Sequence, residues 1–148
     1  MNKILSAALL SLVFANAASA ANITVSAAAS LKETFEAIGE IYEKKYPGDS
    51  VDFNFGGSGA LYQQIKNGAP ADVFASADEF TMSQAQASGS VSGEVRYFAA
   101  NALVLIQPLG ATPQLGSIHA LADAGLRRIA LGNPESVPAG RYAKSALE

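Results

Sequence analysis

The stretch VDFNFGGSGALYQQIKNGAPADVFASAD, residues 51–78, decides the fold because it contains a helix pattern between two strand patterns. Its first five residues alternate between apolar and polar, which is typical of a half-buried strand. The GGSG sequence at 56–59 ends that strand, and a helix pattern follows that runs to Asn67-Gly68. Residues 73–75 form the next apolar run. A strand, a helix and a strand in this order predict two parallel strands joined by a right-handed crossover.

The same alternation of short apolar runs and helix periodicity extends in both directions along the chain. The expected elements, in chain order, are a strand at 23–29, a helix at 31–46, a helix at 79–88, extended segments at 95–98 and 102–106, a short helix at 118–124, a strand at 129–131 and a helix at 138–147. This order predicts an α/β fold with a largely parallel sheet covered on both faces. In such sheets ligands bind at the carboxyl ends of the strands, where the helices begin.

Residues 1–20 have the pattern of a secretory signal peptide. Lys3 precedes an apolar run at 4–14, and Ala18-Ser19-Ala20 supplies small residues at the cleavage position. No run in the chain reaches the roughly 18 uninterrupted apolar residues that a membrane span needs. Because the chain has no cysteine, we expect neither a disulfide nor a lipid anchor. The sequence therefore predicts an exported chain that does not insert into the membrane.

The charge argues against nucleic acid or an anionic membrane as partner. Residues 21–148 carry nine basic and thirteen acidic side chains, a formal charge of −4 with His119 neutral. Binding to a polyanion depends on a basic surface. His119 is the only histidine and has no cluster of other ligands around it in the sequence, so we interpret it as a surface or packing residue.

Ser30 has two compatible interpretations. With Glu33 three residues later it matches the capping box, in which the serine oxygen accepts an N–H bond from the first helical turn. A serine that accepts in this way still has its own proton to donate. A helix start also has unpaired N–H groups and a partial positive charge, which together suit an anion.

Ser58 lies in FGGSGAL, between a strand and a helix. The glycines allow the backbone to approach a ligand closely, although turns without ligands use them too. The stretch resembles the nucleophile elbow of serine hydrolases, but that pattern requires glycine where this chain has Ala60. It also lacks the Gly-Lys-Ser/Thr of a phosphate-binding loop. We therefore disfavour a hydrolase.

The third candidate is the helix start in GNPESVPAGRYAKSAL. Pro138 suits the first helical position, and Ala139 then presents a backbone N–H with little side chain in the way. An ordinary loop before a helix is the alternative. We expect Arg141 to be solvated and Asp78 to act as a helix cap with the help of Ser76.

Four stretches together resemble a known family. AAASLKETFEAI, NFGGSGALYQQIKNGAPADVFASAD, NALVLIQP and IALGNPESVPAGRYAKSAL, in this order, resemble the periplasmic molybdate-binding component of ABC importers. The resemblance covers residues 22–148 and implies a class II periplasmic binding protein with two α/β lobes around a ligand cleft. It divides the chain into a signal peptide at 1–20, a first lobe at 21–100, and a crossing strand with the start of a second lobe at 101–148.

The resemblance also implies a ligand and its binding residues. Molybdate or tungstate would be held by the hydroxyls of Ser30 and Ser58 and by the backbone of Ala139. These residues would contact the oxygens of the anion and would not ligate the metal atom directly. The implied partner is the membrane permease of the importer, and the implied state is a periplasmic monomer with no cofactor and no enzymatic activity.

Family members are considerably longer, so the resemblance predicts a C-terminally truncated chain whose second lobe, with further ligand contacts, is incomplete. Two alternatives stay open at this point. One is a binder of another tetrahedral oxyanion such as sulfate, because a sequence does not measure pocket size. The other is a truncated, non-functional remnant.

Overall fold

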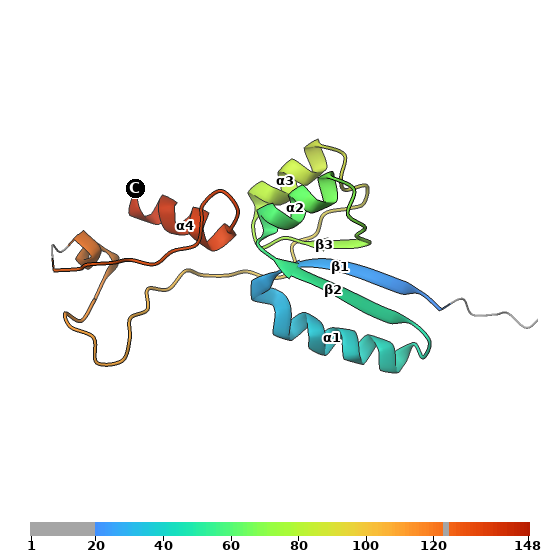
Figure 1. Cartoon of the computed structure of the whole chain (residues 1–148), viewed down its shortest axis with the longest axis horizontal. Coiled ribbons are helices and arrows are strands. Elements are labelled where there is room, and N and C mark those ends of the chain that lie inside the picture. The colour runs from blue at the N-terminus through green and yellow to red at the C-terminus, as the bar shows by residue number, and fades with distance from the viewer. Residues whose placement is uncertain (1–19, 123–124) are drawn as a thin grey trace, which may run out of the picture.

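The computed structural model describes residues 20–122 and 125–148 (Figure 1). Its centre is a three-stranded parallel sheet formed by β1 (Asn22–Ala28), β2 (Ser50–Gly56) and β3 (Val73–Ala75), in the order β2-β1-β3. β1 is the central strand, with Ala28 beside Gly56 and Ala27 beside Ala75. The signal peptide predicted at 1–20 lies outside the described residues except for Ala20.

Helices cover both faces of this sheet, which confirms the predicted α/β class (Figure 1). The 3-10 helix η1 (Ala29–Leu31) leads directly into α1 (Lys32–Lys45) on one face. The helices α2 (Ser58–Lys66) and α3 (Glu79–Ala87) lie together on the other face. The chain then continues through a 3-10 helix, η2 (Ile118–Ala122), to α4 (Pro138–Leu147). No helix of the described residues is long and apolar enough to cross a membrane.

The hydrophobic core around the sheet is small and centres on β1. Val25 and Ala27 of β1 are buried with Ala75 of β3, because a central strand is covered on both faces. α1 approaches β2 closely at Gly39, where an added Cβ would lie 2.8 Å from Cε2 of Phe53. A glycine in a helix interior is destabilising by itself, so we attribute Gly39 to this close packing.

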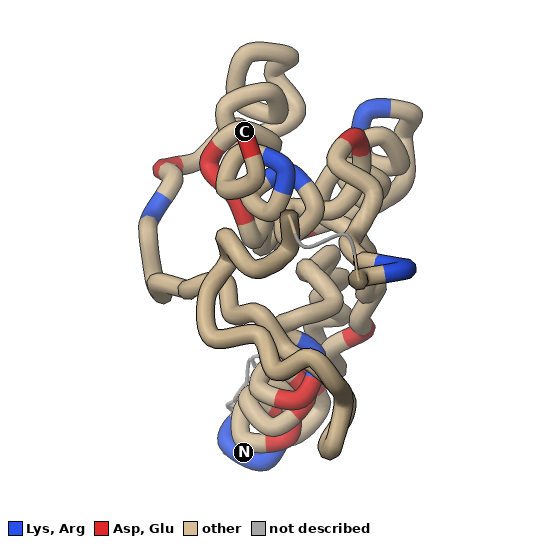
Figure 2. Tube along the Cα trace, turned by 90° about the vertical axis from the view of Figure 1, so that its left-hand side faces the viewer, with Lys and Arg blue, Asp and Glu red and all other residues tan. Residues whose placement is uncertain are grey.

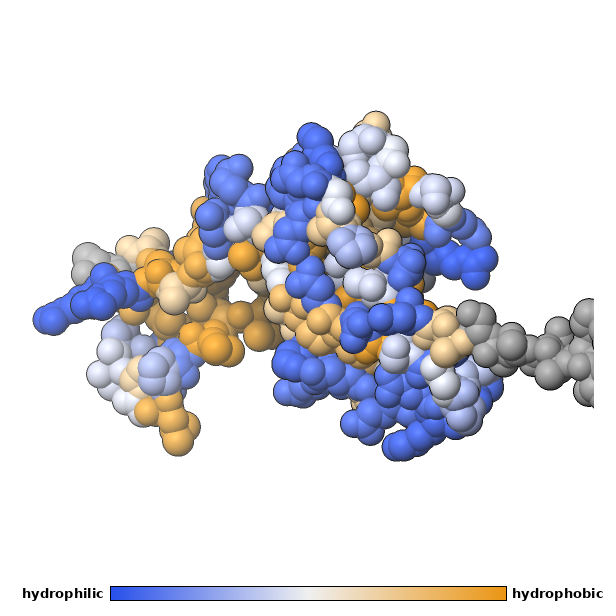
Figure 3. Space-filling model, turned by 45° about the vertical axis from the view of Figure 1, so that its right-hand side comes forward, coloured by the Kyte–Doolittle hydropathy of each residue, from blue (hydrophilic) through white to orange (hydrophobic). Residues whose placement is uncertain are grey.

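The long segment after α3 differs from the prediction. Residues 129–131 do not form the expected strand, and 95–98 and 102–106 run without strand pairing among the described residues. Their apolar side chains are accordingly exposed, with Tyr97 at 78% and Ile106 at 82%. Figure 3 shows apolar residues gathered along this part of the molecule, away from the sheet. Figure 2 shows charged residues along the trace of the helices, whereas residues 97–122 contain no Lys, Arg, Asp or Glu.

The short helix expected at 118–124 is present as the 3-10 helix η2, which ends at Ala122. Residues 123–124 lie outside the described residues. The remaining predicted helices are confirmed, including the stop after α3, where Gly89 has a φ of 71°. A positive φ at this position favours glycine.

Candidate functional site

Three helix starts lie along one edge of the sheet. β1, β2 and β3 run parallel, so their carboxyl ends share an edge, and each leads within a few residues into η1, α2 or α3. The first N–H groups of a helix have no partner within the helix and carry its partial positive charge. The edge therefore gathers backbone donors at the place where α/β proteins bind ligands.

Ser30 lies in η1, with an exposed side chain at this edge. The predicted capping box is wrong, because α1 has Leu31 as its N-cap and no side-chain capping bond. The extra turn of η1 moves the start of α1 past Ser30. Its hydroxyl consequently does not cap α1, and Ser30 lines a surface hollow that Ala139 also lines.

Ser58 is the first residue of α2, and its side chain is fully buried. Its Oγ accepts a hydrogen bond from the backbone N–H of Ala77 at 2.9 Å, which ties the start of α2 to the loop before α3. The hydroxyl proton is not used in this bond. The turn at 133–136 covers the glycine loop here, since an added Cβ on Gly57 would lie 2.6 Å from the carbonyl oxygen of Ser136.

Ala139 is the second residue of α4 and is exposed. The prediction that Pro138 begins this helix is confirmed. Gly140 follows with no room for a side chain, because an added Cβ would clash with the carbonyl oxygen of Gly132. This close packing fixes the backbone at the start of α4 and leaves Ala139 as the small residue that borders the hollow.

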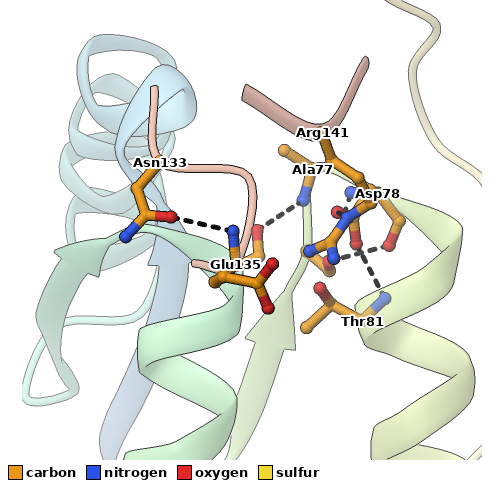
Figure 4. Close-up of polar contacts among 8 residues, drawn as sticks. Ala77, Asp78, Thr81, Asn133, Glu135 and Arg141 are labelled. Atoms are coloured by element: carbon orange, nitrogen blue, oxygen red, sulfur yellow. Dashed lines mark hydrogen bonds and ion pairs between the residues drawn. The ribbon is translucent and has the colours of Figure 1, made fainter. Parts of the chain in front are cut away.

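An ion-paired carboxylate joins α3 to α4 at the same edge (Figure 4). Asp78 is the N-cap of α3, as predicted, and its Oδ1 accepts from the N–H of Thr81 at 2.8 Å. Ser76 assists by donating to the carbonyl oxygen of Asp78 at 2.8 Å. The other carboxylate oxygen, Oδ2, lies 3.3 Å from Nε of Arg141. The prediction that Arg141 is solvated is therefore wrong.

Arg141 is held on two sides. Its side chain is 25% exposed, against 1% for the Asp78 side chain, and its Cζ lies 4.5 Å from the centroid of the Phe80 ring. The sequence carried a signal for Asp78, which precedes a helix, but none for its partner 63 residues away.

These helix starts border part of a wide open hollow of about 1660 Å³, which also extends over β3, α3 and residues 90–103. Its lining at the sheet edge includes Ser30, Gly57, Ser76, Ala77, Asp78, Pro138, Ala139 and Tyr142. Burial and then the nearby charge of Asp78 raise the pKa of Tyr142 above its ordinary value of 10.0, so its hydroxyl is a protonated donor at neutral pH. Among the described residues, no group of three or more His, Cys, Asp or Glu could hold a metal ion.

Helix-start N–H groups and serine hydroxyls along one edge of a parallel sheet are the features with which α/β proteins bind anions. The structure brings Ser30 and Ala139 to one hollow and buries Ser58 behind it, under the 133–136 turn. The role of the three residues in binding stays a prediction. Residues 23–148 match the family described as bacterial extracellular solute-binding proteins, and the chain belongs to this family.

Its curated relatives include proteins with a named ligand. The molybdate-binding protein ModA of Mycobacterium tuberculosis is 40% identical over 121 residues, which cover 82% of this chain and 46% of that protein. The molybdate-binding protein ModA of Escherichia coli is 38% identical over 133 residues, covering 85% and 51%. A solved periplasmic molybdate-binding protein of Azotobacter vinelandii is 36% identical, covering 45% of this chain and 29% of that chain with a TM-score of 0.43. The chain thus spans about half the length of the curated relatives it matches.

Proposed function

We propose that this protein binds molybdate or tungstate at the carboxyl edge of its sheet and delivers the anion to an ABC import permease. The observation that carries the proposal is that Ser30 of η1, Gly57 before α2 and Ala139 of α4 line one hollow. Relatives named for molybdate binding, at 38–40% identity over most of this chain, support the choice of ligand.

The chemistry of the donors suits a tetrahedral dianion. A fully ionised oxyanion offers only acceptors, so a lining of N–H and O–H donors matches it. Each charge-assisted hydrogen bond contributes about 1.5–3 kcal/mol, and several of them together offset the loss of hydration. Phosphate retains a proton near neutral pH and benefits from an acceptor carboxylate, whereas the carboxylate of Asp78 is already occupied by Thr81 and Arg141.

Membership of the solute-binding family supports the proposed role in transport. Extracellular solute-binding proteins act outside the cytoplasmic membrane, which supports a periplasmic location for this chain. We propose two α/β lobes that close over the anion, a membrane permease as the partner, and no covalent chemistry. Within this proposal the ligand contacts are the hydroxyl of Ser30 and the N–H of Ala139, which border the hollow. The hydroxyl of Ser58 is the third predicted contact, and because it is fully buried it reaches the anion only when the 133–136 turn moves away.

Titration calorimetry of the full chain tests the proposal. Molybdate and tungstate should each give saturable heat with one site per chain, and sulfate and phosphate should bind at least tenfold more weakly. Binding of sulfate or phosphate without binding of molybdate would overturn the specificity. A chain that binds none of the four anions would overturn the function.

A matched pair of serine variants tests the site. Ser30→Ala removes one hydrogen bond to a dianion, so we expect a dissociation constant about 10- to 100-fold higher. Ser50→Ala is the control, because Ser50 begins β2 at the opposite end of the sheet and is also exposed. Equal affinities of the two variants would exclude Ser30 from the site.

A further inference from the structure

The carboxylate of Asp78 lies at the edge where the proposed function places a dianion. Asp78 lines the same hollow as Ser30 and Ala139, and it directly follows Ala77, whose N–H is bound by Ser58. Its side chain is 1% exposed. A carboxylate shielded from water is poorly screened and would repel a dianion nearby.

One cation balances this charge. Arg141 Nε lies 3.3 Å from Asp78 Oδ2, and the Phe80 ring packs against the guanidinium at 4.5 Å. Three other carboxylates line the hollow or its rim, those of Asp72, Glu79 and Glu94, and Glu135 lies in the adjoining turn. All four residues are exposed, so water screens their charges. Figure 4 shows Arg141 reaching from α4 to Asp78 at the start of α3.

We infer that Arg141 is a positioning residue for anion binding, which cancels the buried charge of Asp78 and so makes the helix-start edge accessible to a dianion. This inference rests on the proposed function. It differs from a purely mechanical role, in which the ion pair only fastens α4 to α3. The two roles predict opposite effects when Asp78 loses its charge.

The test measures molybdate binding by calorimetry in four versions of this chain: the unchanged protein, Arg141→Met, Asp78→Asn and the double variant. Methionine keeps apolar contact with Phe80 but has no charge. Asparagine keeps an oxygen that accepts from the N–H of Thr81, and it is as good an N-cap as aspartate. Arg141→Lys is the control that retains the positive charge.

Charge cancellation predicts that Arg141→Met weakens molybdate binding at least tenfold, because an unpaired buried carboxylate remains. Asp78→Asn should bind as tightly as the unchanged protein or a few-fold more tightly. The double variant should recover to within about threefold of the unchanged protein, and Arg141→Lys should stay close to it.

If the ion pair only holds α4 against α3, Asp78→Asn and the double variant should bind molybdate as weakly as Arg141→Met. This result would overturn the inference. Circular dichroism checks that each variant is folded. If Arg141→Met does not fold, Asp78→Asn alone decides between the two roles. If the unchanged chain does not bind molybdate, the proposed function itself is wrong. If the unchanged chain binds molybdate and Asp78→Asn binds it weakly, only this inference is wrong.

Discussion

Gly57→Ala tests the contact that covers the candidate site. Gly57 precedes α2 with φ −67° and ψ 134°, values that alanine adopts without strain. Any cost of the substitution therefore comes from its surroundings. The added Cβ would lie 2.6 Å from the carbonyl oxygen of Ser136 and 3.5 Å from Cγ2 of Val137. Backbone atoms cannot swing away as a flexible side chain does, so the turn at 133–136 must shift.

Gly56→Ala, at the last residue of β2, is the matched control. Its added Cβ would meet side-chain atoms of Leu61, at 3.3 Å from Cδ2 and 3.4 Å from Cγ, and no backbone atom of another segment within 4 Å. Both substitutions reduce the freedom of the unfolded chain by a similar amount, about 0.4–1 kcal/mol, which cancels in the comparison. Overpacking against a fixed neighbour costs about 1–3 kcal/mol. We expect Gly57→Ala to be less stable than Gly56→Ala by that amount.

Urea denaturation followed by circular dichroism measures the difference, which corresponds to a midpoint about 0.5–1.5 M lower for Gly57→Ala. Molybdate binding should also weaken, because the 133–136 turn leads directly into Ala139. If Gly57→Ala matches Gly56→Ala in both stability and molybdate affinity, the turn does not pack on this loop, and our account of the site is wrong.

Three further predictions concern stability and association. Thr81→Val should raise the free energy of unfolding by about 1 kcal/mol, because the Thr81 hydroxyl is buried without a hydrogen-bond partner among the described residues; a lower urea midpoint would contradict this. The Tyr42 hydroxyl donates a hydrogen bond to Asp49 at 3.1 Å, and this bond is the main cause that raises the pKa of Tyr42 above 10.0. The stability that the bond contributes is therefore complete below about pH 10 and is lost as the pH rises through the pKa of Tyr42 in the folded protein. The urea midpoint should thus fall more between pH 9 and 11 in the unchanged protein than in Tyr42→Phe, and equal slopes would refute the linkage. Val104→Lys should reduce concentration-dependent light scattering, because Val104 is 77% exposed in an apolar segment without charges; unchanged scattering would show that this segment does not drive association.

Local patterns predicted the sheet and its helices well. β3 was predicted with its observed bounds because a short apolar run lies between turn residues, and the start of α4 was predicted because proline suits the first helical position. The strand expected at 129–131 is not formed, and the reason lies outside the local pattern. An apolar run becomes a strand only when another strand pairs with it, and pairing is a long-range property that a local pattern does not contain.

The candidate site was predicted in part. The helix starts follow from the order of strands and helices, but the capping box at Ser30 was wrong because η1 shifts the start of α1 by a turn. Burial of Ser58 under the 133–136 turn depends on packing between distant segments. The Asp78–Arg141 pair was missed for the same reason, since the two residues meet only in the folded chain.

The most direct test of the central claim is a crystal of this chain soaked with tungstate, with data collected at the tungsten absorption edge. The account predicts one strong anomalous peak per chain at the carboxyl edge of the sheet. The tungstate oxygens should lie about 2.7–3.2 Å from the Ser30 hydroxyl and from the N–H of Ala139, and the 133–136 turn should be displaced so that the Ser58 hydroxyl reaches the same range. A peak elsewhere on the molecule, with none at these helix starts, would contradict it.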